Sequence, residues 1–184
     1  MENQKRLALA LMLCAVSQIA EADIRDRDAL ALARVCVHEA GFTSPDDCSA
    51  IHAVLVRVME RIQGIRTIAA AAELYSPRAT GRVLPRTELD RWVQQLNLRA
   101  TKPAAFGYSW ELNRPRWLER IEQARRLLAG TESHRCDLPI THWGAPSGGD
   151  LERATRARWT RVNCGETRNA FWAVGNERAE DDRD

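Results

Sequence analysis

The chain has 184 residues, which is the length of one domain of ordinary size and too short for two large ones. With 45% hydrophobic and 28% charged residues, its composition is that of a folded globular protein and excludes an intrinsically disordered chain. The net charge of +2 comes from 27 basic and 25 acidic residues spread along the sequence, so no strong basic field favours nucleic acid as a partner.

The N-terminal residues 1–22 predict an export signal. A positively charged start is followed by a short apolar run, Leu7 to Val16, and by a small-x-small cleavage site at Ala20-Glu21-Ala22. The apolar run is too short to span a bilayer, which disfavours an uncleaved anchor, and Cys14 lacks the preceding small residue that a lipid anchor needs. We expect a secreted or periplasmic protein that begins at Asp23 and has no membrane span after signal cleavage.

Removal of the signal leaves an even set of cysteines: Cys36, Cys48, Cys136 and Cys164. Such a set is typical of proteins folded in an oxidising compartment, so two disulfides are expected. Four cysteines allow three pairings, and closeness along the chain favours Cys36 with Cys48 and Cys136 with Cys164. A zinc site is the alternative, but the sequence contains no C-x-x-C pair to support it.

The first helix of the mature chain is predicted from Arg27 to Ala40. Leu30, Ala33 and Val37 recur at helical spacing, and Gly41 follows as a left-handed stop. This boundary places Glu39 on the final turn of the helix.

A second helix has the clearest start signal in the chain. Ser44 is its cap, Pro45 occupies the first turn, and Asp47 completes a capping box three residues after the cap. An apolar stripe then predicts a core helix: Ile51, Val54, Leu55, Val58, Met59 and Ile62.

Further helices are predicted at Thr67 to Leu74, Thr87 to Leu96 and Pro115 to Ala129. The last of these has Gly130 as its stop and an expected inward face: Trp117, Leu118, Ile121, Ala124 and Leu128. Beyond Cys136, frequent proline and glycine predict a loop-rich segment with a short helix near Leu151 to Trp159 and a strand near Ala170 to Val174.

These elements predict a mainly α (α+β) fold in one domain, with a loop-rich C-terminal segment and two disulfides. We expect the domain to cover residues 23–176. Residues 177–184 are nearly all charged and carry no apolar face, so a disordered tail is expected there.

Glu39 is the first candidate for chemistry, because it stands beside His38 at the end of an otherwise apolar helix. Partial loss of hydration disfavours the carboxylate anion, and the negative end of the helix macrodipole acts in the same direction. A carboxyl that keeps its proton near neutral pH is what donation to a glycosidic oxygen requires. These residues alone leave open the alternative of a solvated surface glutamate.

Metal, cofactor and nucleophile chemistry have no matching motif. His38-Glu39 begins like a zinc-protease helix, but Phe42 stands where the second histidine of H-E-x-x-H should be. The chain has no G-x-S-x-G elbow and no Gly-rich phosphate loop, so no cofactor is expected. Acid-base chemistry remains.

Aromatic residues are a weaker indication of a sugar site. Their amphipathic rings can stack on sugar faces in a half-wet groove, and most of the tryptophans stand late in the chain with two tyrosines: Tyr75, Trp92, Tyr108, Trp110, Trp143, Trp159 and Trp172. Trp117 has helical spacing and is expected in the core. Trp143 is the better groove candidate, because Thr141-His142-Trp143-Gly144 is typical of an irregular loop.

The order of several segments resembles the SleB-type cell wall hydrolases. The run from Ala33 to Ala40 and the stretch from Ala50 to Met59 are similar to the family's opening, where a Gly-Glu-Ala motif precedes an apolar helix ending in Asn-Arg-Val. Here His38 and Val56 replace the family's Gly and Asn. Leu74 to Pro77, Thr141 to Trp143 and Asn169 to Trp172 follow in the family's order, the last with Asn169 in place of a histidine.

The resemblance implies a lysozyme-like helical fold and cleavage of peptidoglycan glycan strands, with Glu39 as the general acid and base of a lytic transglycosylase or muramidase. Asp46, Asp47 and Glu73 are candidates for a second carboxylate, although helix-start charge explains the first two better. Residues expected at the substrate are His38, Tyr75, His142, Trp143, Asn169, Phe171 and Trp172.

Two other interpretations fit the same residues. A secreted, non-catalytic module of this fold could bind glycan or a partner protein without cutting it. An exported structural protein would instead have all of its tryptophan rings in the core. The sequence leaves the oligomeric state open.

Overall fold

The computed structural model describes residues 27–76 and 110–174. The predicted export signal, the predicted helix from Thr87 to Leu96 and the charged tail lie outside the described residues. Within the described ranges the fold is mainly helical with a small sheet, as the sequence predicts.

The first two helices form where the sequence places them. The first helix covers residues 27–40, and Gly41 ends it with a φ of 72°. Helix α2 (Pro45–Arg61) begins at the cap Ser44, whose hydroxyl accepts a hydrogen bond from the Asp47 N–H. Its apolar stripe is buried as far as Val58, whereas Ile62 follows the last helical residue and is exposed.

Helix α3 (Ile68–Tyr75) is capped from two sides. Thr67 accepts a hydrogen bond from the Ala70 N–H, and Asp28 of the first helix accepts one from the Ala69 N–H at 2.9 Å. Burial raises the pKa of Asp28, and the backbone N–H groups of Ala69 and Ile68 oppose the rise. Asp28 therefore joins the start of the first helix to the start of α3.

Helix α6 (Trp110–Leu128) begins earlier than predicted, across a kink at Asn113. Pro115 explains the kink, because proline disfavours helical geometry in the chain just before it. The inward face also differs from the prediction: Leu118 is 46% exposed, and Leu127 takes a buried place instead. Trp117 lies in the core as expected.

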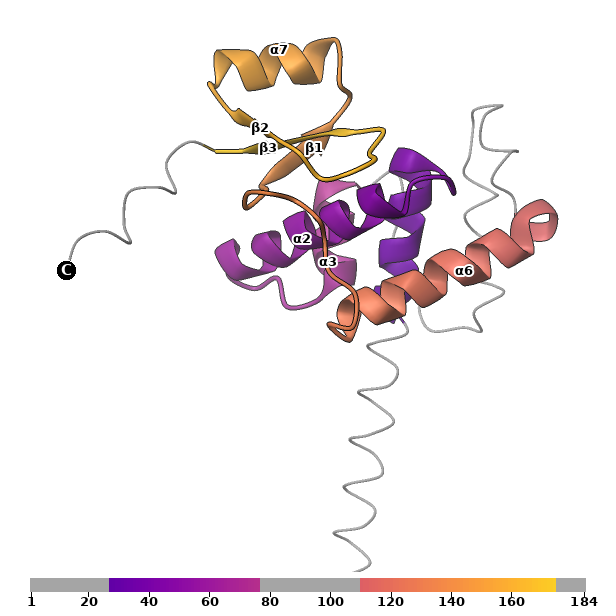
Figure 1. The fold of residues 1–184 in the computed structure, drawn as a ribbon. Helices are drawn as coiled ribbons and strands as arrows, with labels where there is room; N and C mark the ends of the chain where they lie inside the picture. The colour runs from indigo at the N-terminus through magenta and orange to yellow at the C-terminus, as the bar shows by residue number, and fades with distance from the viewer. Residues whose placement is uncertain (1–26, 77–109, 175–184) are drawn as a thin grey trace, which may run out of the picture.

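The C-terminal segment contains more regular structure than its composition predicts. The described part holds a three-stranded antiparallel sheet of β1 (His142–Gly144), β2 (Thr160–Val162) and β3 (Ala170–Ala173), with β3 in the centre. The segment expected as an irregular loop around Trp143 is therefore strand β1. Helix α7 (Gly149–Arg156) covers one side of the sheet and the larger helices lie on the other (Figure 1).

Side chains alternate along a strand, so neighbouring rows of cross-strand pairs point to opposite faces of the sheet and pack against different hydrophobic clusters. Trp143, Phe171 and Val162 are paired across the strands and pack against the main helical core. The neighbouring row contains Trp172, which packs with Ala154 of α7 in a second small cluster. The central strand is consequently covered on both faces.

Both disulfides have the pairing favoured by closeness along the chain. Cys36–Cys48 joins the first helix to α2, and Cys136–Cys164 joins the segment after α6 to the one before β3. The cysteine sulfurs are bonded to one another, so the zinc alternative does not hold for them.

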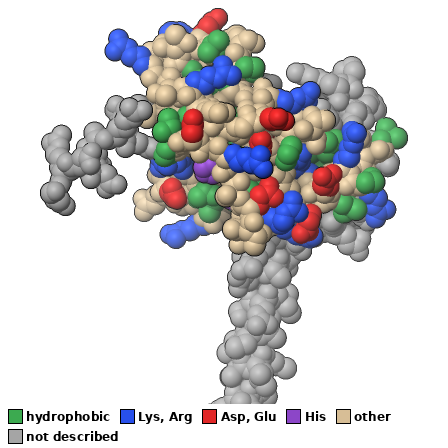
Figure 2. Space-filling model, in the orientation of Figure 1, with side chains coloured by type: hydrophobic (Ala, Val, Ile, Leu, Met, Phe, Trp, Pro, Cys, Tyr) green, Lys and Arg blue, Asp and Glu red, His purple; other side chains and the backbone are tan. Residues whose placement is uncertain are grey.

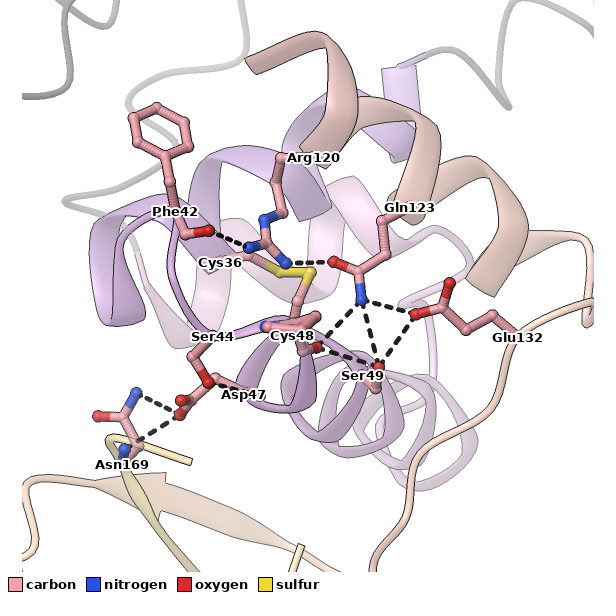
Figure 3. The surroundings of a disulfide bond; sticks show 11 residues. Cys36, Phe42, Ser44, Asp47, Cys48, Ser49, Arg120, Gln123, Glu132 and Asn169 are labelled. Atoms are coloured by element: carbon pink, nitrogen blue, oxygen red, sulfur yellow. Dashed lines mark hydrogen bonds between the residues drawn. A yellow bond between two sulfur atoms is a disulfide. The ribbon is translucent and has the colours of Figure 1, made fainter. Parts of the chain in front are cut away.

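Buried polar side chains of α6 bond the backbone near the Cys36–Cys48 bridge (Figure 3). Arg120 donates to the Phe42 carbonyl at 2.9 Å, and Gln123 donates to the Pro45 carbonyl at 3.0 Å. The turn between the first helix and α2 is thereby attached to α6.

Basic and acidic side chains alternate over the face of the molecule drawn in Figure 2, in keeping with the small net charge. Of the helices that the structure describes, none has the length and apolar character needed to cross a membrane.

Removing the Cys36–Cys48 bridge with the double variant C36A/C48A should lower the free energy of unfolding by about 2 to 4 kcal/mol, because the unfolded chain gains freedom. Urea titration followed by circular dichroism measures the loss. The comparison variant C136A/C164A opens a longer loop, 28 residues against 12, and should lose slightly more. An unchanged unfolding free energy in C36A/C48A would contradict this account of the bridge.

Candidate functional site

Glu39 lies on the last turn of the first helix, and its side chain is partly buried. The Ser76 hydroxyl donates a hydrogen bond to Glu39 Oε1 at 2.7 Å. Ser76 directly follows helix α3 and is only 6% exposed. The carboxyl therefore faces the end of α3, and the hydrogen bond from Ser76 orients it.

The backbone of the same helical turn is held from the β2–β3 loop (residues 163–169). The Asn169 side-chain amide donates to the Glu39 carbonyl at 3.4 Å, and the Arg168 guanidinium donates to the Ala40 carbonyl at 3.3 Å. The last carbonyls of a helix have no partner within the helix, and cationic or N–H groups there are favourable. Asn169 thus contacts the backbone of Glu39.

Asp47 differs from the capping-box residue that the sequence predicts. Its N–H bonds to Ser44 as expected, but its carboxylate turns to the β2–β3 loop and accepts from Arg168 N at 2.6 Å and Asn169 N at 3.0 Å. The Asn169 side-chain amide also donates to it at 2.9 Å. Asp46 similarly accepts from the Glu166 N–H at 2.9 Å. Both carboxylates bind the loop, so helix-start charge is not their whole role.

An aromatic pair involves the residue that precedes Ser76 in the chain. Tyr75 immediately precedes Ser76, and its ring centroid lies 5.7 Å from that of Trp143 at a tilt of 34°. Tyr75 is 40% exposed and Trp143 is partly buried, so the pair keeps some surface in contact with solvent. One ring of this pair therefore belongs to the chain neighbour of Ser76, which bonds Glu39.

The contacts of His142 differ from those of Trp143, although the two residues are neighbours in the sequence. Its ring stacks on Trp159 with centroids 4.0 Å apart, and its Nδ1 lies 2.9 Å from the Thr141 hydroxyl. Burial lowers the pKa of His142, and the positive charges of Arg61 and Arg153 lower it further.

Phe171 and Trp172 do not fit the expectation that they contact substrate. They are 1% and 2% exposed, because β3 is the central strand and both of its faces are covered. Neither ring has a face free for a ligand. His38 is exposed next to Glu39, where it remains accessible.

The tryptophans of the described residues are not all core. Trp117 and Trp172 are buried, whereas Trp143 and Trp159 are only partly so. This distribution weakens the interpretation of a purely structural protein.

Ser76 and Arg168 contact the last turn of the first helix and were not singled out from the sequence. The contact of Ser76 with Glu39 joins residues 37 positions apart, and no spacing rule predicts such a pair. The residue types of Tyr75 and Trp143 predicted a role at a sugar site, but their contact with each other was not predicted.

No group of histidine, cysteine, aspartate or glutamate side chains in residues 27–76 and 110–174 is arranged to hold a metal ion. Comparisons of the chain with profiles of protein families, with curated proteins and with solved structures found no match.

The protein should lose stability as the pH falls below the ordinary histidine value of 6.5. Burial lowers the pKa of both His52 and His142, with His134 adding to the effect at His52. The unfolded chain then binds protons before the folded one does, so acid favours unfolding. The free energy of unfolding, measured by urea titration from about pH 7 to about pH 5.5, should decrease.

A double variant, H52Q/H142Q, should show a smaller decrease over the same range, whereas substitution of the exposed His38 by glutamine should leave it unchanged. If the free energy of unfolding decreased equally with falling pH in the wild type and in both variants, the assignment of this pH dependence to His52 and His142 would be contradicted.

Proposed function

We propose that this protein is a secreted or periplasmic enzyme that cleaves peptidoglycan glycan strands, with Glu39 as general acid and then general base. The observation that carries the proposal is the hydrogen bond from Ser76 to the partly buried Glu39, together with the contact between Trp143 and Tyr75, the residue before Ser76. The two disulfides fit an oxidising compartment. The sequence resemblance to SleB-type cell wall hydrolases, which implies a lysozyme-like fold, favours the same function.

Glu39 would protonate the glycosidic oxygen as the bond to the anomeric carbon breaks. The resulting carboxylate would then take a proton from the nucleophile that attacks the anomeric carbon. If the nucleophile is the sugar's own 6-hydroxyl, the product is a 1,6-anhydro sugar, and if it is water, the product is a reducing sugar. Tyr75 and Trp143 would stack on the sugar faces.

The surroundings of Asp46 and Asp47 favour the anhydro product. Both carboxylates accept hydrogen bonds from backbone N–H groups of the β2–β3 loop, and Asp47 is 0% exposed. They are therefore poorly suited to activate a separate water molecule or to act as a nucleophile. A single carboxyl group that serves as acid and base is consistent with lytic transglycosylation.

A non-catalytic glycan-binding or protein-binding module is the second candidate. The partly exposed ring of Tyr75 against Trp143 could bind a sugar without any cleavage. The two candidates differ in what they require of Glu39.

Glu39→Gln should lower the release of muropeptides from purified peptidoglycan by about 10²- to 10⁴-fold, because an amide cannot donate and regain the proton. Binding to insoluble peptidoglycan, measured by co-sedimentation, should remain. Glu60→Gln, which changes an exposed glutamate of α2 that has no role in the proposed site, is the control and should keep activity. If folded wild-type protein binds peptidoglycan but releases no product detectable by mass spectrometry, the binding module is correct and the enzyme is not.

Ser76→Ala should lower kcat by about tenfold or more, because a hydrogen bond to a charged group stabilises by about 1.5 to 3 kcal/mol and its loss frees the Glu39 side chain. Ser76→Thr retains the hydroxyl and should recover most of the rate. Initial rates on soluble glycan fragments provide the measurement. A fully active Ser76→Ala variant would exclude this role for Ser76.

A further inference from the structure

Asp47 is a carboxylate with no exposed surface, and its position is costly unless its oxygens are bonded. The oxygens accept from the backbone N–H groups of Arg168 and Asn169 and from the Asn169 side-chain amide, 121 or 122 positions away in the chain. Figure 3 shows the two bonds between Asp47 and Asn169. Asp47 thus fixes the end of the β2–β3 loop.

The two residues that Asp47 holds are also the ones that reach the turn of Glu39. The second N–H of the Asn169 amide is directed at the Glu39 carbonyl, and the Arg168 guanidinium bonds the Ala40 carbonyl. A continuous chain of hydrogen bonds therefore runs from Asp47 through Asn169 to the backbone of Glu39.

The contacts of Asp47 are not needed merely to attach the β2–β3 loop to the start of α2, because other groups already attach it there. Asp46 accepts from Glu166 N, and Ser44 donates to the Glu166 carbonyl at 2.9 Å. Gly165 has a φ of 87°, and a Cβ there would stand 2.5 Å from Asp46 Oδ2, so the loop fits tightly against Asp46. The contacts of Asp47 are directed instead to the residues that bond the Glu39 turn.

We infer that Asp47 and Asn169 are positioning residues that hold Glu39 for reaction through its backbone, while Ser76 orients its carboxyl. The inference rests on the proposed function. It gives Asn169 a role different from the substrate contact that the sequence predicts. A displacement of about 1 Å at a reacting group can cost about 10²-fold in rate, which makes such support worthwhile.

Asn169→Ala tests the inference most directly, because it removes the side-chain amide and leaves the backbone bond to Asp47. It should lower kcat on soluble glycan fragments by about 10- to 100-fold and leave KM within about twofold. Amide hydrogen exchange should increase about fivefold at Gly41, whose N–H bonds the Val37 carbonyl at 2.9 Å, and should stay constant in α6. Circular dichroism at the assay temperature shows whether the variant is folded.

Asp46→Asn is the matched control, because Asp46 stands in the same helical turn and binds the same loop without contacting the Glu39 turn in the described structure. It should change neither kcat nor exchange at Gly41. Asp47→Asn is the second test variant, for use if Asn169→Ala does not fold. Its amide places N–H groups against loop N–H donors, so it should reproduce both effects.

The outcomes separate this inference from the proposed function. Unchanged exchange at Gly41 in the folded test variant, or increased exchange with an unchanged kcat, would overturn the positioning role while wild-type activity stands. A folded wild-type protein without activity would overturn the proposed function, and the inference would fall with it.

Discussion

The buried carboxylate of Asp47 stands where two helix ends meet. The Cys36–Cys48 bridge, with Cα atoms 4.9 Å apart, joins the first helix near its C-terminus to α2 near its N-terminus. One end presents backbone carbonyl oxygens and the other presents the carboxylates of Asp46 and Asp47, and because all of these groups are acceptors, the two ends cannot satisfy each other. The β2–β3 loop resolves this, because its backbone N–H groups bind Asp46 and Asp47 while its side chains bond the carbonyls of the first helix.

The sheet depends on the same contact. Strand β3 starts at Ala170, directly after Asn169, so the bonds to Asp47 hold the residue that precedes the central strand. The register of β3 then pairs Phe171 with Trp143 and directs both to the helical core. Trp143 meets Tyr75 as a result.

Local signals in the sequence predict much of this fold. The cap Ser44, the stop Gly41 and the spacing of cysteines concern residues close along the chain, and the structure confirms the helix boundaries and the disulfide pairing they predict. Strands β1 and β2 have three residues each, which is too short for an alternating pattern to be recognised.

Long-range contacts explain the other differences. Phe171 and Trp172 are aromatic, as residues of a sugar-binding groove often are. Their burial could not be predicted from the sequence, because it depends on α7 and the helical core covering the two faces of β3. The contacts of Glu39 with Ser76 and of Asp47 with Asn169 also join distant segments, and no local pattern encodes them. The residue type and position of Glu39 made it a candidate from the sequence, whereas the residues that support it could be identified only from the structure.

The chemistry of a hydroxyl partner suits the proposed double role of Glu39. A serine hydroxyl has one donor and two acceptor positions, so it can donate to a carboxylate and accept from a carboxylic acid. Ser76 can therefore keep its contact with Glu39 both before and after proton transfer to the glycosidic oxygen. A guanidinium or ammonium partner could only donate, and it would hold the group in its charged form. A neutral, two-way partner at the side chain, combined with backbone support from Asn169, leaves the proton free to move while the atoms that carry it stay in place.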